Sequence, residues 1–183
     1  MTALLRFHQV TLRRGGRLLF EGLDLELGPG ERLHVAGPNG SGKSSLIRLA
    51  AGLLRAERGR IARSALALAE DALALDRELP LKRALSFWGG ATEESMAAMG
   101  IAELAPVPVR LLSSGQLKRA TLARVAASGA PLWLLDEPLN ALDSEGVERL
   151  ANLVERHVAV GGAVLAASHQ SLPGEWHGLE LAQ

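Results

Sequence analysis

The sequence of 183 residues contains no cysteine and no tyrosine, and its aromatic content is 3%. The absence of cysteine excludes disulfides and cysteine-ligated metal sites. Basic and acidic side chains number 20 each, so the formal net charge is zero and the composition gives no support for nucleic-acid binding. The chain therefore resembles neither a disulfide scaffold nor a strongly basic nucleic-acid-binding protein.

Long hydrophobic segments are also missing. The longest apolar stretches span about five to seven residues, far fewer than the roughly 18 to 20 that cross a bilayer. The N-terminus does not read as a basic and then apolar signal peptide. We therefore expect a cytoplasmic protein without direct membrane insertion, which reaches a membrane only through a partner. With 48% hydrophobic residues, residues 1–183 can form one globular domain.

A glycine-rich phosphate loop is the most informative motif that is present. Residues 37–44 read Gly-Pro-Asn-Gly-Ser-Gly-Lys-Ser, and such a loop directs successive backbone N–H groups at the phosphates of a nucleoside triphosphate. Lys43 is expected to reach the β- and γ-phosphates, and the Ser44 hydroxyl to ligate Mg²⁺. The expected nucleotide-binding residues of this segment are Gly37, Pro38, Asn39, Gly40, Ser41, Gly42, Lys43, Ser44 and Ser45.

The segments on either side of the loop fit this interpretation. The strand-like segment Arg32–Ala36 precedes it, and in residues 45–54 the side chains of Leu46, Leu49 and Leu53 recur at helical spacing. A helix in this position would place the phosphates at its N-terminus, where the backbone N–H groups and the helix dipole favour an anion.

Two adjacent carboxylates supply the second half of the predicted chemistry. The apolar run at residues 132–135 is typical of a buried strand, and it ends in Asp136 and Glu137. Because ligands of open α/β sheets bind at the carboxyl ends of the strands, both acids should lie beside the phosphate loop. Asp136 is expected to ligate Mg²⁺, and Glu137 to orient the attacking water or accept its proton.

The remaining segments predict an α/β fold with a mainly parallel core sheet and an N-terminal antiparallel β subdomain. Residues 71–105 read as short helices with a break at Gly89-Gly90 and a stop at Gly100, which gives a small helical subdomain at about residues 72–115. The other predicted elements are strands in Leu4–Leu12, Arg17–Leu27, Ala65–Ala69 and Ala163–Ala167, helices in Gln116–Ser128 and Glu145–Val158, and a charged turn at Arg55–Arg63.

A serine-glycine tract, Leu112-Ser113-Ser114-Gly115-Gln116, lies between the two halves. Taken alone, such a tract would more often be a helix cap. Together with the phosphate loop before it and Leu-Leu-Asp-Glu-Pro after it, it resembles the signature loop of the ABC transporter ATPases, and the resemblance covers nearly the whole chain. This implies a P-loop NTPase that binds and hydrolyses ATP in a head-to-tail homodimer, where Ser113, Gly115 and Gln116 of one copy face the γ-phosphate held by the other.

Two further positions are similar to the same family. Residues 140–143 resemble the D-loop that crosses the dimer interface, so Asp143 is counted among the nucleotide-site residues. His169 follows an apolar strand and resembles the switch histidine, which contacts the γ-phosphate or positions the attacking water. In isolation, a histidine in such a position is more often structural. The resemblance makes Glu137, His169 and Lys43 the expected catalytic residues.

The sequence departs from the family pattern at three places. The first hairpin offers no aromatic residue to stack on adenine; the Arg14 guanidinium can replace it, or the arginines there form a solvated turn. The glutamine expected before the helical subdomain is missing, and Glu70-Asp71-Ala72 occupies that region, either as an acidic Mg²⁺ site or as a charged turn. Ser114 replaces a more common glycine.

Within the family, the chain resembles the CcmA-type ATP-binding subunit of the haem exporter in cytochrome c maturation. This resemblance implies a transmembrane permease partner, which would dock around Leu81–Trp88, and a peripheral position on the cytoplasmic face of the membrane. Two alternatives stay open: an ATPase of a different ABC exporter or importer, and a weakly catalytic nucleotide-dependent regulatory module. The segments that carry the resemblance are residues 19–23, 132–143, 146–147, 161–162 and 168–170.

Overall fold

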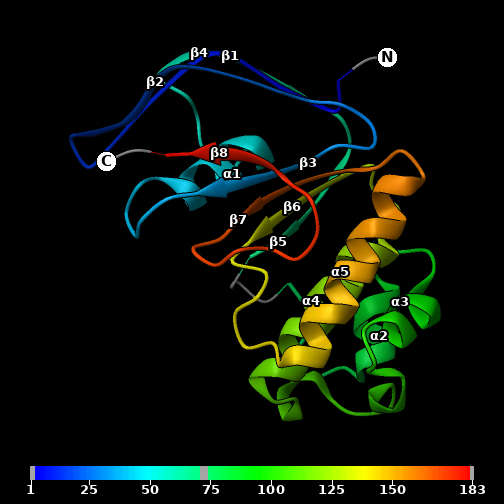
Figure 1. The fold of residues 1–183 in the computed structure, drawn as a ribbon. Helices are drawn as coiled ribbons and strands as arrows, with labels where there is room; N and C mark the ends of the chain where they lie inside the picture. Colours follow the sequence, from blue (N-terminus) through cyan, green and yellow to red (C-terminus); the bar gives the residue numbers. More distant parts are fainter. Residues whose placement is uncertain (1–2, 71–73, 182–183) are drawn as a thin grey trace.

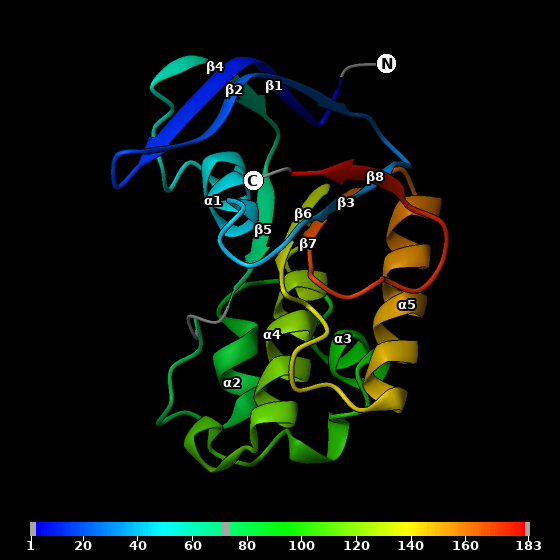
Figure 2. The ribbon, with the colours of Figure 1, turned by 60° about the vertical axis from the view of Figure 1, so that its left-hand side comes forward.

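The computed structural model describes residues 3–70 and 74–181. Two sheets and a group of helices are arranged in layers (Figure 1). An antiparallel sheet with strand order β2-β1-β4 and a parallel sheet with order β5-β6-β7-β3-β8 enclose helix α1 between them. Helices α2 to α5 lie on the other side of the parallel sheet (Figure 2). The predicted α/β fold with a mainly parallel core sheet and an N-terminal antiparallel part is confirmed.

The elements have the following bounds. The strands are β1 (Leu5–Arg14), β2 (Arg17–Leu27), β3 (Arg32–Ala36), β4 (Arg58–Arg63), β5 (Leu66–Ala69), β6 (Leu132–Asp136), β7 (Ala163–Ala167) and β8 (His177–Glu180). The helices are α1 (Lys43–Ala51), α2 (Leu81–Ser86), α3 (Thr92–Ala98), α4 (Ser114–Ala127) and α5 (Ser144–Ala159), with short 3-10 turns at Ala102–Leu104 and Val109–Leu111.

The two faces of the parallel sheet carry separate hydrophobic cores, because successive side chains of a strand point to opposite faces. Leu132 and Leu134 of β6 pack with α1 residues such as Ile47 and with the antiparallel sheet. Trp133 and Leu135 pack with the helices on the opposite face. Burial on both sides explains why β6 is continuously apolar in sequence, and it fixes Asp136 and Glu137 at the end of a rigid strand.

Residues 58–63 contradict the predicted charged turn, because they form β4 and pair antiparallel with β1. Ile61 lies opposite Phe7 and packs against the core, while the arginines of the strand are exposed. At Gly59, where φ is +91°, a Cβ would lie 2.4 Å from the Gln9 carbonyl oxygen. Because this strand has a single apolar residue facing the core and a glycine that distorts its backbone, its sequence lacks the alternation of apolar and polar residues that predicts a strand.

Helix α1 begins at Lys43, two residues earlier than predicted, and ends at Ala51. Gly52 follows with φ +78°, and its N–H donates to the Arg48 carbonyl oxygen, as in a left-handed helix cap. Leu53 consequently lies outside the helix and is 58% exposed. Its predicted place on the apolar helix face is therefore wrong.

The predicted short helices are present as α2 and α3, with the break at Gly89-Gly90 between them. Gly100 ends this part with φ +66°. Residues 71–73 of the predicted helical segment lie outside the described residues. Within residues 3–70 and 74–181, no helix combines the length and the apolar character needed to cross a membrane.

Strand β8 is the other element that the sequence did not predict. It pairs parallel with β3 at the edge of the five-stranded sheet, and only Leu179 among its four residues is apolar. The strand matters for the site because it leads to Leu181, whose N–H donates to the Ala36 carbonyl oxygen at 2.9 Å, directly before the phosphate loop.

Candidate active site

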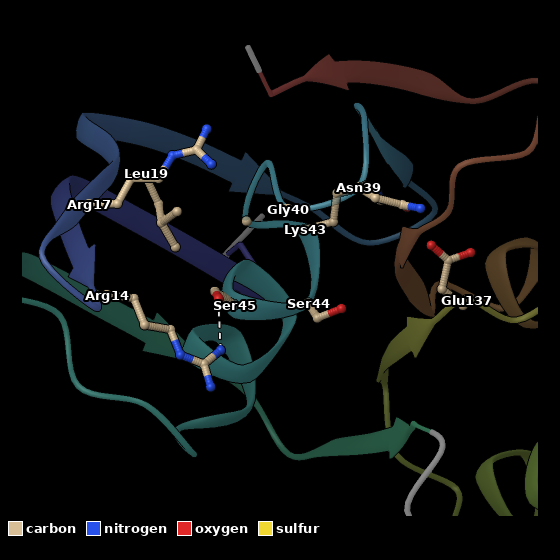
Figure 3. A pocket seen from close by; sticks show the side chains of 10 residues that line it. Arg14, Arg17, Leu19, Asn39, Gly40, Lys43, Ser44, Ser45 and Glu137 are labelled. Carbon is tan, nitrogen blue, oxygen red and sulfur yellow. Dashed lines mark hydrogen bonds between the residues drawn. The ribbon is translucent and has the colours of Figure 1, made fainter. Parts of the chain in front are cut away.

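The phosphate loop opens into a cavity of about 390 Å³ at the carboxyl edge of the parallel sheet. Glu137 lies on the opposite side of the opening from Arg14 (Figure 3). Among the predicted loop residues, Gly37, Pro38 and Ser41 are not part of the lining. The lining residues are Arg14, Arg17 and Leu19 of the β1–β2 hairpin, Asn39, Gly40, Gly42, Lys43, Ser44 and Ser45 of the loop and α1, and Glu137 after β6.

The loop backbone depends on its glycines, as Gly37 and Gly42 show. Gly37 has φ +144° and Gly42 has φ +105°, and a Cβ on Gly37 would lie 2.7 Å from the Leu181 carbonyl oxygen. Lys43 Nζ donates to the carbonyl oxygens of Gly37 at 2.8 Å and Pro38 at 3.2 Å. The ammonium group is thus held by the loop's own carbonyls, at the head of α1.

Ser44 and Asp136 meet as the sequence predicts. Ser44 Oγ donates to Asp136 Oδ1 at 3.0 Å, although the two residues lie 92 positions apart in the chain. Hydroxyl and carboxylate oxygens suit Mg²⁺, which is usually held by one or two protein groups together with substrate phosphates and waters. The hydroxyl of Ser44 and the carboxylate of Asp136 therefore fit the predicted Mg²⁺ site as oxygen ligands.

Glu137 and His169 form a direct pair. Glu137 Oε2 lies 2.8 Å from His169 Nδ1, and because a carboxylate only accepts, the ring N–H is the donor. The Glu137 side chain is 20% exposed, compared with 47% for His169. Glu137 has φ +45°, an uncommon value for a non-glycine residue, and its N–H donates to the Ala167 carbonyl oxygen at 2.8 Å. These contacts hold its carboxylate between the cavity and the histidine.

The wall of the cavity beyond the loop is formed by the β1–β2 hairpin. Arg14 Nη1 donates to Ser45 Oγ at 3.3 Å (Figure 3), so the guanidinium turns toward α1. Arg17 and Leu19 line the same wall. Neither residue was predicted to belong to the site. Arg17 lies close to Arg14 across the Gly15-Gly16 turn, and Leu19 belongs to the segment at residues 19–23 that carries part of the family resemblance. This wall joins cationic groups to an aliphatic surface, with no aromatic side chain among its lining residues.

The signature tract begins helix α4. Ser113 is the N-cap: its Oγ accepts from the Gln116 N–H at 3.3 Å, while Gln116 Oε1 accepts from the Ser113 N–H at 2.9 Å. This capping box satisfies donors that a helix start leaves free. The tract borders a second cavity of about 330 Å³, lined by Gly100, Ile101, Glu103, Leu104, Ser113, Gly115, Gln116, Arg119, Ala141 and Asp143.

Asp143 lies in the wall of this second cavity and not in the first. Its Oδ1 accepts from the Gly146 N–H at 2.9 Å and from Arg119 Nη2 at 2.5 Å. The Gly146 N–H, and then the Arg119 guanidinium, hold the pKa of the Asp143 carboxyl below its ordinary value. The loop before Asp143 touches the signature tract, since a Cβ on Gly115 would lie 2.9 Å from the Ala141 carbonyl oxygen.

Glu70 occupies the region where the family has a glutamine. Its Oε2 lies 3.3 Å from Nε and Nη2 of Arg48 on α1. It lines a third cavity of about 320 Å³ together with Leu53 and Trp88, and is not among the residues that line the phosphate-loop cavity. Residues 71 and 72, the rest of this region, lie outside the described residues.

A phosphate loop at the head of a helix, with an acidic pair at the end of a buried strand of the same parallel sheet, defines a P-loop nucleoside triphosphatase. Residues 20–140 match the ABC transporter family. The chain belongs to this family, and it is an ABC-type ATPase as the sequence predicted.

Two relatives indicate to which branch of the ABC transporter family the chain is similar. The chain is 53% identical over 180 residues to the cytochrome c biogenesis ATP-binding export protein CcmA of Sphingopyxis alaskensis, an alignment that covers 94% of this chain and 93% of that protein. It is 55% identical over 166 residues to the protein of the same name from Novosphingobium aromaticivorans, covering 89% and 87%. The predicted resemblance to the CcmA-type branch is confirmed.

Solved structures agree on the fold. The ATP-binding subunit of an ABC transporter superposes with a TM-score of 0.82 at 21% identity, covering 91% of this chain and 79% of the other. A protein from Pyrococcus furiosus gives the same TM-score at 18% identity and covers 97% and 96%. At such low identity the likeness establishes the architecture alone.

Proposed function

We propose that this chain is the ATP-hydrolysing subunit of an ABC transporter for cytochrome c biogenesis, working in a complex of the haem-exporter type. The observation that carries the proposal is the 53% identity, over 94% of the chain, to a protein named for that process. Residues 1–183 act as one ATPase domain, in which residues 72–115 are the helical subdomain.

ATP binds with its phosphates in the loop at residues 37–44. The ammonium of Lys43 faces the β- and γ-phosphates, and the N-terminal N–H groups of α1 surround them. Ser44 and Asp136 hold Mg²⁺, which when bound neutralises charge on the phosphate oxygens. The Arg14 guanidinium lies over the nucleobase, a role supported by its position in the cavity wall.

Hydrolysis requires a water in line with the bond that breaks. Glu137 orients this water and accepts its proton as the water oxygen bonds to the γ-phosphorus and the bond to the bridging oxygen of ADP breaks. The 2.8 Å contact between Glu137 and His169 supports a role for the histidine in fixing the carboxylate. His169 also reaches the γ-phosphate, so the pair responds to the presence of intact ATP.

Two copies complete each site in a head-to-tail homodimer. Within one chain, the phosphate-loop cavity and the signature cavity have no lining residue in common. This separation supports an arrangement in which Ser113, Gly115 and Gln116 of one copy close over ATP held by the other. Hydrolysis removes the γ-phosphate contact that joins the copies, and the dimer reopens.

The membrane partner is a transmembrane permease subunit, and this chain is peripheral at the cytoplasmic face. The third cavity supports this assignment, because Leu53, Leu68 and Trp88 give it a mainly apolar wall. Phe87 is 81% exposed and contacts Trp88 edge to face, with the ring centroids 5.5 Å apart, so the two rings form part of an exposed apolar patch of the kind that marks interaction sites. A permease helix would dock on this surface.

The test is to trap the complex in its native membranes. The Glu137→Gln variant is incubated with ATP, purified, and analysed by mass spectrometry for co-purifying proteins. The matched control is the Glu137→Gln, Lys43→Ala double variant, which should bind ATP more weakly and, at an ATP concentration that saturates only the single variant, should lose any ATP-dependent partner contact.

Three outcomes separate the proposals. Recovery of a multi-span membrane protein with other cytochrome c biogenesis proteins would support the proposed function. An unrelated permease would keep the ATPase and assign it to another ABC exporter or importer. Absence of any membrane protein, with wild-type ATPase activity close to zero in the presence of membranes, would favour a nucleotide-dependent regulatory module.

A further inference from the structure

Arg119 borders the signature cavity and joins three segments of the chain. Its side chain is only 11% exposed. Nη2 lies 2.5 Å from Asp143 Oδ1 and 3.6 Å from Glu145 Oε2, and Nη1 donates to the Met99 carbonyl oxygen at 3.3 Å. One guanidinium on α4 therefore contacts the end of α3, the loop before α5 and the first turn of α5.

The loop before α5 is shaped to accept this guanidinium. Asp143 Oδ1, which binds Arg119, also accepts the Gly146 N–H and so caps α5. A Cβ on Gly146 would lie 3.0 Å from that oxygen and 3.3 Å from Arg119 Nε. Ala141 in the same loop has φ +64°, a conformation that favours glycine and so needs support from its surroundings. The cap supports the loop from one side, and Arg119 from the other.

Arg149 offers an internal comparison, because it holds the same end of α3 from helix α5. Nη1 donates to the carbonyl oxygens of Ala97 at 3.4 Å and Ala98 at 3.2 Å. Its ion-pair partner among the described residues is Glu145, at 2.8 Å. Arg119 and Arg149 thus both contact the end of α3 and Glu145. Arg119 also contacts Asp143, which Arg149 does not.

We propose that Arg119 is a positioning residue for ATP hydrolysis, acting through Asp143 to hold the loop at residues 141–143 against the signature end of α4. The inference rests on the proposed function, in which this end closes over ATP held by a second copy. Because Ser113 and Gly115 line the same cavity as the loop, movement of the loop changes the surface that meets the partner's nucleotide.

The contact is suited to positioning more than to fold stability. The Asp143 side chain is 67% exposed, and ion pairs with such exposure contribute little to folding. If Arg119 is removed, Asp143 keeps its cap on α5, so the helix remains. The loop loses the support that faces the signature tract, and the contacts of Arg119 with Met99 and Glu145 are lost as well.

The experiment uses the Glu137→Gln full-length chain, whose ATP-bound dimer should persist. Dimer formation is followed by light scattering as ATP is raised, and ATP affinity of the separate subunit is measured at low protein concentration. Arg119→Ala should raise the ATP concentration at half-maximal dimer formation about 3- to 10-fold, with unchanged ATP affinity of the subunit. Arg149→Ala is the matched control and should leave both values near those of the parent.

Asp143→Asn supplies a second variant that keeps the fold. Asparagine is as good an N-cap as aspartate, but it lacks the charge that binds Arg119. It should weaken dimer formation as Arg119→Ala does, and the double variant should be no worse than either single one. This non-additivity is not expected of two independent structural defects.

The outcomes separate the inference from the function on which it rests. Equal ATP dependence of dimer formation with and without Arg119, or an equal shift from Arg149→Ala, would overturn the positioning role while leaving the ATPase dimer intact. If the Glu137→Gln protein with Arg119 present forms no dimer at saturating ATP, the proposed dimer and this inference fall together.

Discussion

The phosphate-loop cavity and the signature cavity of this chain are built in different ways. In the phosphate-loop cavity the reactive side chains already contact one another, Ser44 with Asp136 at 3.0 Å and Glu137 with His169 at 2.8 Å. In the signature cavity the capping box of Ser113 satisfies the helix start, and the charged lining residues Arg119 and Asp143 are paired with each other beside glycine and apolar residues. The first cavity brings the groups proposed to act on ATP together within one chain, whereas the second is proposed to meet ATP that is held by a second copy.

This difference leads us to expect that substitutions in the phosphate-loop cavity and in the signature cavity affect different steps. Substitutions in the phosphate-loop cavity should change what a single subunit does with ATP. Substitutions around the signature cavity should leave the single subunit unchanged, and their effect should appear only when two subunits meet. Assays at low and at high protein concentration can therefore test the comparison directly.

Glu137→Gln should produce the largest effect. Loss of a catalytic base lowers turnover by about 100- to 10,000-fold, while ATP still binds because the phosphate loop is untouched. Phosphate release measured with and without membranes checks this. Glu93→Gln, which alters an exposed acid paired with Lys82, is the control. A variant at position 137 with wild-type turnover would remove Glu137 from the chemistry.

Lys43→Ala should weaken ATP binding by the single subunit. A charge-assisted contact to phosphate is lost, which corresponds to a rise in Kd of about 10- to 100-fold. Isothermal titration at low protein concentration gives the value, and Lys82→Ala is the control because it removes the same charge from the exposed pair. Unchanged affinity in the Lys43 variant would contradict the role of the loop.

Gly115→Ala should act only on the signature half. The added Cβ would lie 2.9 Å from the Ala141 carbonyl oxygen, so the loop must move at a cost of about 1–3 kcal/mol. We expect dimer formation to need about 5- to 160-fold more ATP, with the subunit's own Kd for ATP unchanged. Ser114→Ala, one residue earlier, is the control. A changed Kd in the Gly115 variant would mean that the two halves are not separate.

His157 touches neither half and gives the smallest expected effect. Its ring stacks on Trp133, with the ring centroids 3.7 Å apart, and burial lowers its pKa below the ordinary value of about 6.5. As the pH falls, the unfolded chain therefore binds the proton at a higher pH than the folded chain does. The contribution of neutral His157 to the free energy of unfolding is fully present above about pH 6.5, and it decreases as the pH falls toward the lower folded pKa.

Thermal unfolding at pH 8 and pH 5.5 measures this effect. Each kcal/mol lost lowers Tm by about 2–4 °C in a domain of this size. His157→Gln should reduce the decrease in Tm between the two pH values, and His177→Gln, at an exposed position on β8, should not. An identical decrease in the wild type and the His157 variant would assign the acid sensitivity to other groups.

The phosphate-loop half could be predicted from sequence because its residues are local or follow strands. Residues 37–44 are contiguous, and Asp136 and Glu137 end a run of apolar residues, so the sheet edge brings them together whatever the details of packing. The Ser44 to Asp136 contact at 3.0 Å follows from this topology.

The signature half was less predictable. Its residues were identified through family resemblance, and Arg119 gave no local signal because its partners, Asp143 and Met99, come from other segments. Edge strands with many charged residues are also difficult to predict. The sequence of β4 was interpreted as a turn because its arginines, which face solvent, make it look like a charged loop. Leu53 was misplaced because a single glycine ends α1 one turn early.

The backbone of Glu137 carries a further consequence. Its φ of +45° is a conformation that glycine adopts freely and that other residues adopt at a cost on the order of 1 kcal/mol. The carboxylate that is proposed to activate the attacking water therefore occupies a position where the fold alone would prefer a residue without a side chain. At this residue the requirements of stability and of the proposed activity differ. The most stable form of this domain would therefore be one that lacks the carboxylate and does not hydrolyse ATP.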